Sequence, residues 1–207
     1  MTTAFQYVFD NAESIGINIQ PVTASTVSRD ATVRTTARGG AVWRFDVRLP
    51  DGIPWSTARP YIATIDAAGR ATPGTVQINN AGYNTWLTPY LGDAANPAAI
   101  TASWTAGATS ITLTGGQAGA GYNFRAGDII QLGSSGSVYQ VKADVVYSSN
   151  TVTLNRAILD ATGSGTLEVG PDVTWSVICT DLPQWTIFAR DQVSWSGSFV
   201  FYEDLVS

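Results

Sequence analysis

The feature that most constrains the fold is the strict alternation of apolar and charged side chains in WRFDVRL, residues 43–49. This two-residue period is typical of a β-strand that is buried on one face and exposed on the other. The face expected in the core carries Trp43, Phe45, Val47 and Leu49. Turn signals stand on both sides, Gly39-Gly40 before the segment and Pro50-Asp51-Gly52 after it, so we expect a strand bounded by two turns.

Most of the chain follows the same pattern, and one segment has helical spacing. VTWSVICTD, residues 173–181, places Cys179 on an apolar strand face. RPYIATIDAAGR, residues 59–70, predicts one short helix with Pro60 in its first turn and Gly69 at its C-terminal end. The expected fold class is therefore mainly β.

The sequence predicts two domains, one of which is inserted into the other. GDAANPAA, residues 92–99, has the composition of a linker, and ATGSG, residues 161–165, marks a second one. The short strands between them, separated by glycine and serine, indicate a small β-barrel that closes on itself. We therefore expect a discontinuous β domain over residues 1–98 and 168–207, and an inserted β-barrel domain over residues 99–167.

Low charge and many apolar side chains limit what the surface can do. Charged residues make up 13% of the chain and hydrophobic residues 44%, whereas roughly 25% charged residues are usual in soluble domains. This composition favours an assembly that covers much of the surface. The net charge of −5 does not indicate phosphate binding. No run of residues predicts a membrane span or a signal peptide, so we expect synthesis in a cytoplasm and no membrane insertion.

Residues able to carry catalysis are scarce. The chain has no histidine, and its single cysteine, Cys179, is expected in the core. Asp128, Asp144 and Asp160 each stand next to a strand end, where aspartate commonly makes turns. No spacing predicts a carboxylate pair, a metal site or a phosphate-binding loop. The sequence therefore predicts a protein that is not an enzyme and that has no cofactor and no metal.

Half of the arginines fall within one stretch of the chain, whereas Lys142 is the only lysine. Arginine favours fixed, bidentate or stacked contacts. Contacts between subunits are the preferred interpretation, and a solvated strand face or nucleic-acid contact are the alternatives. The residues concerned are Arg29, Arg34, Arg38, Arg44 and Arg48.

Aromatic side chains offer a second candidate surface. Flat aromatic rings can stack on sugar rings. The aromatic residues of this chain are spread over its whole length, however, which favours a role for them in the core or in interfaces. The alternative function is accordingly a carbohydrate-binding β module for attachment to a host surface. An outer docking surface on the inserted domain is expected to include Trp104, Tyr122 and Phe124.

Several stretches, in their order along the chain, resemble the distal tail proteins of long-tailed phages (siphophages) and of related tail-derived particles. STVSRDATVRTTARGGAVWRFDVRLP, from residue 25, is similar to the family's opening β-hairpin arm and strand. ARPYIATIDAAGRATPGTVQI, from residue 58, is similar to its helix, glycine and strand, and QVSWSGSFVFYEDLVS, from residue 192, to its closing strand. Between them, GATSITLTGG, FRAGDIIQLGSSGSVYQVKADV and TVTLNRAIL resemble an inserted OB-like module.

The resemblance implies a structural virion protein without catalytic activity. Such proteins form a homohexameric ring at the distal end of the tail tube, where the discontinuous, tail-tube-like domain continues the tube wall and the inserted domain faces outward. The implied partners are the tail tube protein, the baseplate hub or tail-tip protein, and receptor-binding proteins or fibres. DNA would meet the ring only while passing through its lumen. Another structural tail component, such as a tube or terminator protein, is a further alternative.

Overall fold

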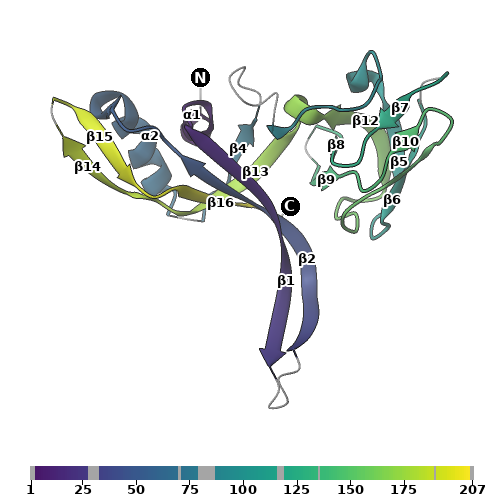
Figure 1. The fold of residues 1–207 in the computed structure, drawn as a ribbon, viewed down its shortest axis with the longest axis horizontal. Helices are drawn as coiled ribbons and strands as arrows, with labels where there is room; N and C mark the ends of the chain where they lie inside the picture. Colours follow the sequence, from purple (N-terminus) through teal and green to yellow (C-terminus); the bar gives the residue numbers. More distant parts are fainter. Residues whose placement is uncertain are drawn as a thin grey trace. The chain divides into compact units, whose positions relative to one another are not determined.

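The computed structural model describes residues 3–27, 33–69, 71–78, 87–115, 119–134, 136–188 and 190–205, with the backbone alone for residues 21–27 and 33–40. The fold is mainly β, as predicted, with helices α1 (Ala4–Asp10) and α2 (Trp55–Ala67) (Figure 1). None of the described helices is long and apolar enough to cross a membrane.

Two compact units divide the chain. The first consists of Met1–Thr75 with Ser176–Ser207, and the second of Val76–Trp175. The second unit therefore starts before the boundary expected near residue 98 and ends after the one expected near residue 168. It includes the segment of residues 92–99, whose composition is that of a linker.

A five-stranded sheet forms the centre of the first unit. Its strands, in spatial order, are β1 (Ser14–Val27), β2 (Val33–Arg48), β16 (Phe199–Glu203), β13 (Thr174–Asp181) and β4 (Gly74–Gln77). The alternating segment of residues 43–49 begins in β2, and its four apolar side chains are all buried, as predicted. The apolar face of β13 is buried in the same way, and it includes the thiol of Cys179.

Helix α1 packs its aromatic side chains on this sheet. Phe9 contacts Phe45 and Phe201, with ring centroids 5.7 and 5.1 Å apart. The hydroxyl oxygen of Thr3 caps the helix by accepting a hydrogen bond from the backbone N–H of Gln6. Sequence analysis did not predict α1, because aromatic and β-branched residues favour strands. A helix this short is stable only through its tertiary packing.

Helix α2 starts at Trp55, so Pro60 lies inside the helix and not in its first turn as expected. The proline removes only the hydrogen bond to the carbonyl of Ser56, one residue from the helix start. Asp191 holds that start: its carbonyl accepts from the N–H of Trp55 at 2.6 Å, and its carboxylate accepts from the N–H of Ser56 at 3.0 Å. Gly69 follows the helix with φ of +62°, which agrees with the predicted C-terminal stop.

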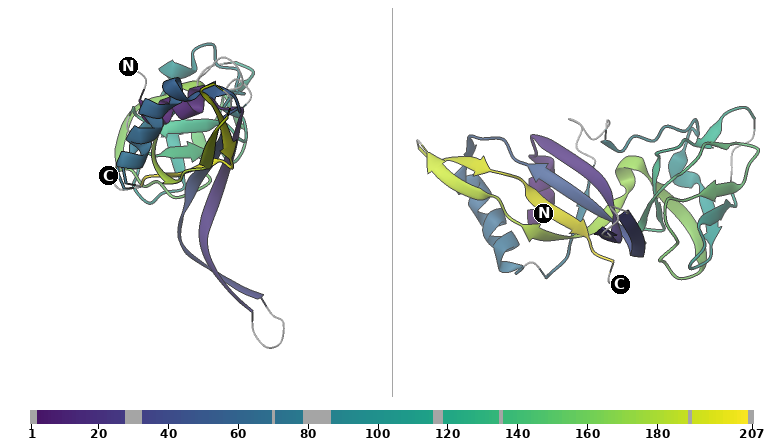
Figure 2. Two further views of the ribbon diagram at one scale, coloured as in Figure 1. Left: turned by 90° about the vertical axis from the view of Figure 1, so that its left-hand side faces the viewer. Right: turned by 60° about the horizontal axis from the view of Figure 1, so that its bottom comes forward.

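The hairpin of β1 and β2 extends beyond the rest of the sheet. β16 pairs with β2 only from Arg44 to Val47. Past this stretch, β1 and β2 pair only with each other within the described ranges. Figures 1 and 2 show the resulting two-stranded ribbon running away from the sheet. We call residues 21–27 and 33–41 of this ribbon the arm.

A β-bulge interrupts the arm where it leaves the sheet. Pro21 faces Ala41 and Thr23 faces Ala37, so three residues of β2 stand opposite a single residue of β1. Gly39-Gly40 belongs to these three residues, and the predicted turn before residue 43 is therefore wrong. Glycine in a strand commonly marks a bulge of this kind, because it tolerates the local change in backbone conformation.

A smaller antiparallel sheet completes the first unit. Its strands, in spatial order, are β14 (Gln184–Phe188), β15 (Gln192–Ser196) and β3 (Ile53–Pro54). The carboxylate of Asp51 accepts a hydrogen bond from the backbone N–H of Trp195 at 2.9 Å. Together with Asp191 at the start of α2, this contact ties the β14–β15 hairpin to residues 51–56.

The second unit is built on a six-stranded sheet around its own apolar core. The strands, in spatial order, are β11 (Thr151–Thr153), β6 (Ser110–Leu113), β5 (Thr101–Trp104), β12 (Gly163–Val169), β8 (Ile129–Leu132) and β9 (Val138–Gln140). A short ribbon of β7 (Tyr122–Phe124) and β10 (Val145–Val146) lies beside it. Short 3-10 turns at Pro97–Ala99 and Gly170–Asp172 precede β5 and β13.

The two edge strands of the six-stranded sheet meet each other. Val141, after β9, forms an antiparallel bridge with Leu154, after β11. The N–H of Lys142 donates to the carbonyl of Thr153 at 2.9 Å, and the N–H of Asn155 donates to a carbonyl in β9 at 3.0 Å. The sheet therefore closes on itself as a small barrel, which removes its free edges.

Tyr139 is the largest polar residue in the core of the barrel. It is fully buried, and its hydroxyl donates to the carboxylate of Asp160 at 2.5 Å and accepts from the N–H of Leu159 at 2.8 Å. The other oxygen of Asp160 accepts from the N–H of Ser137 at 2.8 Å. Burial raises the pKa of Tyr139 to about 12, and the contact with Asp160 acts in the same direction.

Tyr139→Phe should lower the free energy of unfolding by about 1–3 kcal/mol, because it removes the buried hydroxyl that binds the half-buried carboxylate of Asp160 and the N–H of Leu159. Tyr147→Phe is the matched control, since Tyr147 is half-buried and no hydrogen bond of its hydroxyl is found in the described part of the chain. We expect the control to change stability by less than about 0.5 kcal/mol. Urea unfolding measures both values, and equal losses would contradict the role of the Tyr139 hydroxyl.

The same hydroxyl predicts how stability depends on alkaline pH. A tyrosine in the unfolded chain has a pKa of about 10, so the folded state keeps this proton at pH values where the unfolded state loses it. The contribution is complete below pH 10 and is lost as the pH rises to about 12. Unfolding measured between pH 9 and 12 should therefore show a steeper loss of stability in the wild type than in Tyr139→Phe.

Candidate functional site

The structure separates the five arginines that were expected to contact a neighbouring subunit. Arg29 lies outside the described residues, and Arg34 and Arg38 lie on the arm, where only the backbone is described. Arg44 pairs with Asp46 at 2.7 Å, and the guanidinium of Arg48 lies 3.4 Å from the carboxylate of Glu13. Arg44 and Arg48 are thus balanced by acids of their own chain, and the arginines of the arm remain the candidates for contacts with another subunit.

Strand β14 is the most unusual surface of the first unit. All five of its residues are exposed. Its three large apolar side chains, Trp185, Ile187 and Phe188, expose 43, 47 and 43% of their surface. The ring of Trp185 stacks on Trp55 of α2, with centroids 4.2 Å apart. The sequence does not reveal this exposure, because a run such as QWTIF is equally compatible with a strand in the core.

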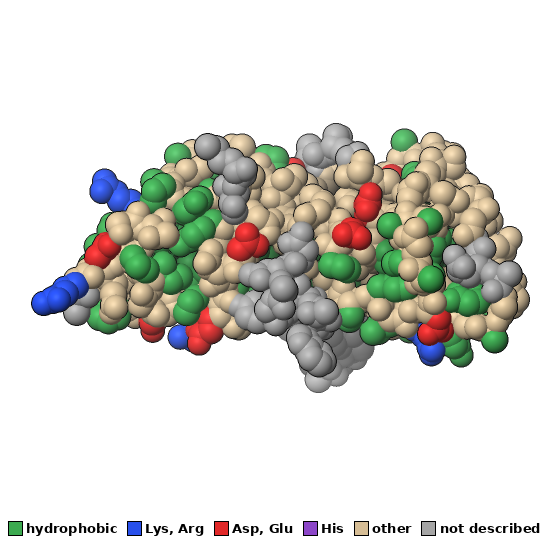
Figure 3. All heavy atoms as spheres, turned by 90° about the horizontal axis from the view of Figure 1, so that it is seen from above, with side chains coloured by type: hydrophobic (Ala, Val, Ile, Leu, Met, Phe, Trp, Pro, Cys, Tyr) green, Lys and Arg blue, Asp and Glu red, His purple; other side chains and the backbone are tan. Residues whose placement is uncertain are grey.

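The faces of the protein carry few charges. Figure 3 shows one such face, on which hydrophobic side chains reach the surface and acidic or basic side chains are widely spaced. Charged residues total only 13% of the chain. An exposed apolar strand on such a surface is poorly protected from association with other chains.

The expected docking surface on the second unit needs correction. Phe124 is fully buried in the barrel core, where its ring meets Tyr90 edge to face, so it cannot contribute to a docking surface. Trp104 is half-buried, and its indole N–H donates to the carbonyl of Ala161 at 2.9 Å. Tyr122 is the first residue of β7, two positions before Phe124, and is half-buried. Residues two apart in a regular strand share a face, but the pairing of β7 with β10 shifts in register between Phe124 and Tyr122, and only Phe124 of the two is fully buried.

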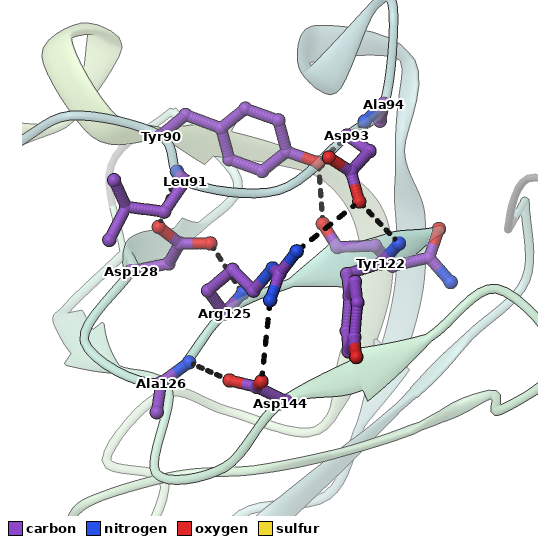
Figure 4. Close-up of polar contacts among 10 residues, drawn as sticks. Tyr90, Leu91, Asp93, Ala94, Tyr122, Arg125, Ala126, Asp128 and Asp144 are labelled. Carbon is purple, nitrogen blue, oxygen red and sulfur yellow. Dashed lines mark hydrogen bonds and ion pairs between the residues drawn. The ribbon is translucent and has the colours of Figure 1, made fainter. Parts of the chain in front are cut away.

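Tyr122 belongs to a polar cluster centred on Arg125 (Figure 4). The guanidinium of Arg125 lies 3.5 Å from the centre of the Tyr122 ring. It also lies 3.7 Å from a carboxylate oxygen of Asp93 and 3.7 Å from one of Asp144. Both acids in turn accept backbone N–H groups, Asp93 from Tyr122 at 2.9 Å and Asp144 from Ala126 at 2.8 Å. We call these four side chains the Arg125 cluster.

Beneath the cluster, Asp128 is fully buried. Its carboxylate accepts the N–H of Leu91 at 2.7 Å and the N–H of Arg125 at 2.8 Å. Burial raises the pKa of Asp128, while the two N–H donors act in the opposite direction. Asp128 therefore joins the segment around residue 91 to the turn after β7, a structural role that agrees with the turn acid expected from the sequence.

Tyr90 makes a second connection between the same two segments. Its hydroxyl donates to the carbonyl of Asn123 at 2.5 Å and accepts from the N–H of Ala94 at 3.2 Å (Figure 4). Burial raises the pKa of Tyr90 to about 12. Gly92 is required here, because a Cβ atom at this position would lie 2.3 Å from the Tyr90 hydroxyl and 2.6 Å from the Asn123 carbonyl. These contacts hold residues 90–94 against the barrel.

The side chains of the Arg125 cluster are engaged with one another and with the backbone. The acids of the Arg125 cluster are engaged by backbone N–H groups and by the guanidinium, so they act as structural hydrogen-bond acceptors. An open hollow of about 480 Å³ on the barrel contains no acid; its lining residues are Thr109, Lys142, Ala143, Thr153, Leu154 and Asn155. Among the described residues, no three potential metal ligands come together.

Gly92→Ala should destabilise the protein by about 2–4 kcal/mol, because the added methyl group displaces Tyr90 and breaks both hydrogen bonds of its hydroxyl. Gly163→Ala is the control, since a Cβ atom there would lie 3.5 Å from the nearest atoms of Trp104, an ordinary contact distance. The free energies of unfolding of both variants test this expectation. Equal stability of the two variants would show that Tyr90 does not need the space above Gly92.

The structure thus offers two surfaces that can carry a function, the arm and the exposed strand β14. No protein-family model matches this chain, and no curated protein is significantly similar to it. Its function is therefore inferred from the geometry and charge of these surfaces.

Proposed function

We propose that this protein is a structural subunit that assembles with copies of itself into a ring, and that the ring forms the distal end of a phage tail tube. The observation that carries this proposal is the arm, a two-stranded ribbon that leaves the sheet of the first unit and pairs with no other described strand. In this function the first unit builds the ring wall and the second unit lies outside it.

The arm is poorly stable by itself. A two-stranded ribbon in water is only marginally stable, because the little apolar surface that it buries barely offsets the loss of backbone entropy. The bulge at Gly39-Gly40 separates it from the part of β2 that is supported by β16. A second chain that covers the arm would supply the missing contacts. A neighbouring subunit of the same kind is the simplest source of such a chain.

Charge favours this contact between copies. Residues 21–41 contain three arginines and one aspartate, a net charge of +2. The whole chain carries −5, so the residues outside the arm carry −7. A basic arm is attracted to the acidic body of another copy, which raises the rate of encounter and orients the two molecules. The contact joins different surfaces on the two subunits, and contacts of this type form a closed ring when the rotation between neighbouring subunits closes.

The remaining features are compatible with a structural role. The chain is poor in charge, acids such as Asp51 and Asp128 hold loops, and β14 leaves three large apolar side chains exposed. The position at the tail end rests on the resemblance to distal tail proteins. It implies a hexamer that contacts the tube protein and the hub, and that receptor-binding proteins or fibres join. A wall with net negative charge would hold few DNA phosphates during passage.

Deletion of residues 29–38 should abolish ring assembly, because it removes the tip of the arm and much of its β2 strand. Mass measurement of the purified chain is expected to give six times the 21.9 kDa subunit for the wild type and a monomer for the deletion. Hydrogen exchange in β8 and β12 should be unchanged, since these strands belong to the second unit. Rings formed by the deletion variant, or a monomeric wild type, would overturn the proposal.

A charge variant distinguishes the effect of the arm's charge on assembly from the effect of the arm's length. Replacing Arg29, Arg34 and Arg38 by glutamine keeps the ribbon and lowers its net charge from +2 to −1. Assembly of this variant should require a higher protein concentration than assembly of the wild type at low salt. The difference should shrink as the salt concentration rises, because salt screens exposed charges. A difference that does not depend on salt would contradict an electrostatic role of the arm.

A further inference from the structure

Strand β14 lacks the features that normally protect the edge of a sheet. It lies at the outside of the β14–β15–β3 sheet and pairs with β15 alone among the described strands. Its five residues include no charge, no proline and no irregularity in register with β15. Natural edge strands are usually short, charged or interrupted, because an open edge is a template for another strand. An open and apolar edge in a stable protein therefore indicates a partner strand.

The apolar side chains around this edge are suited to an interface. Trp185 is supported from below by the stacked ring of Trp55, and Ile187 and Phe188 follow it on the same strand. Aromatic side chains dominate the energetics of protein interfaces, and tryptophan is among the residues enriched where most of the binding energy is concentrated. Strand addition combines such side-chain contacts with backbone hydrogen bonds along the edge.

The arm of the same molecule does not cover β14. Figures 1 and 2 show the arm and the β14–β15 hairpin leaving the first unit in different directions. Both belong to the first unit, and β14 pairs only with β15. The arm and β14 are thus two open strand edges of one chain that do not meet within it.

Their charges are complementary. The residues that form the small sheet and its connections, 51–54 and 181–196, contain three aspartates and one arginine, a net charge of −2. The arm carries +2. Opposite charges of this size favour contact between the arm of one copy and the small sheet of another, and disfavour contact between two arms.

We infer that β14 is the surface on which the arm of a neighbouring copy docks, by adding a strand of the arm to the free edge of the small sheet. The inference rests on the ring proposed above and names the partner of the arm within it. Each copy then gives one arm and receives one, so that every arm and every β14 edge in a closed ring is paired.

A lysine substitution on the open edge tests this contact. Ile187→Lys puts a charge where the docked strand would lie, while the free subunit tolerates it because 47% of the side chain is exposed. Leu159→Lys is the matched control, because Leu159 is also 47% exposed but lies on the second unit. We expect Ile187→Lys to raise the protein concentration needed for assembly at least about tenfold. The Leu159→Lys control should assemble like the wild type.

A disulfide experiment identifies the two surfaces directly. Ile187→Cys is mixed with Thr35→Cys, or with Thr36→Cys, under mild oxidation. Two successive arm positions are used because successive side chains of a strand point to opposite faces. Cys179 is buried and does not compete. A disulfide-linked dimer that forms in one of the mixtures, and in neither variant alone, supports the docking of the arm on β14.

The outcomes distinguish this inference from the ring itself. A wild type that assembles, an Ile187→Lys variant that assembles equally well and the absence of disulfide in both mixtures would overturn the role of β14 and leave the ring intact. Loss of assembly in Ile187→Lys without disulfide in either mixture would overturn the arm as the partner of β14. A monomeric wild type would overturn the ring and the docking together.

Discussion

The structure of the first unit depends on the unequal support of strand β2 along its length. Near its C-terminal end, β2 is paired on both sides, by β1 and β16, and buries Phe45 and Val47 beneath the rings of α1 and β16. Beyond the bulge it is paired by β1 alone. One half of the strand is therefore anchored by the hydrophobic effect, and the other half is supported, among the described strands, by β1 alone. A rigid base with an unsupported extension is suited to an arm that binds another molecule.

In the second unit the outer strands of the main sheet are protected in a different way. Its outer strands meet at Val141 and Leu154, so the sheet closes and needs no partner. Its polar residues act within the unit: Asp160 binds Tyr139 and Ser137, and Asp128 binds the backbone of Leu91. The open edges of the first unit and the closed barrel of the second together favour assembly through the first unit.

Some of the candidate sites could be read from the sequence, and others could not. The aspartates next to strand ends were predicted as turn residues because short-range hydrogen bonding depends on local chemistry. Phe124 was assigned to the surface because the sequence does not tell which face of a three-residue strand points inward. The exposure of β14 could not be predicted for a similar reason, because apolar residues at consecutive positions are compatible with a buried strand and with an exposed one. The Arg125 cluster joins residues 93, 122, 125 and 144, and only the fold brings these segments together.

The sequence by itself determined the mainly β fold, the buried faces of β2 and β13, and the end of α2 just before Gly69, because side-chain periodicity and the conformational freedom of glycine act over a few residues. Its charges also determined that the arm is basic and that the rest of the chain is acidic. Only the tertiary structure decided that residues 4–10 form a helix, that Gly39-Gly40 is a bulge within a long strand, and that β14 lies at an open edge. These features depend on which distant segments pack together, and that choice is made by the burial of apolar surface over the whole unit.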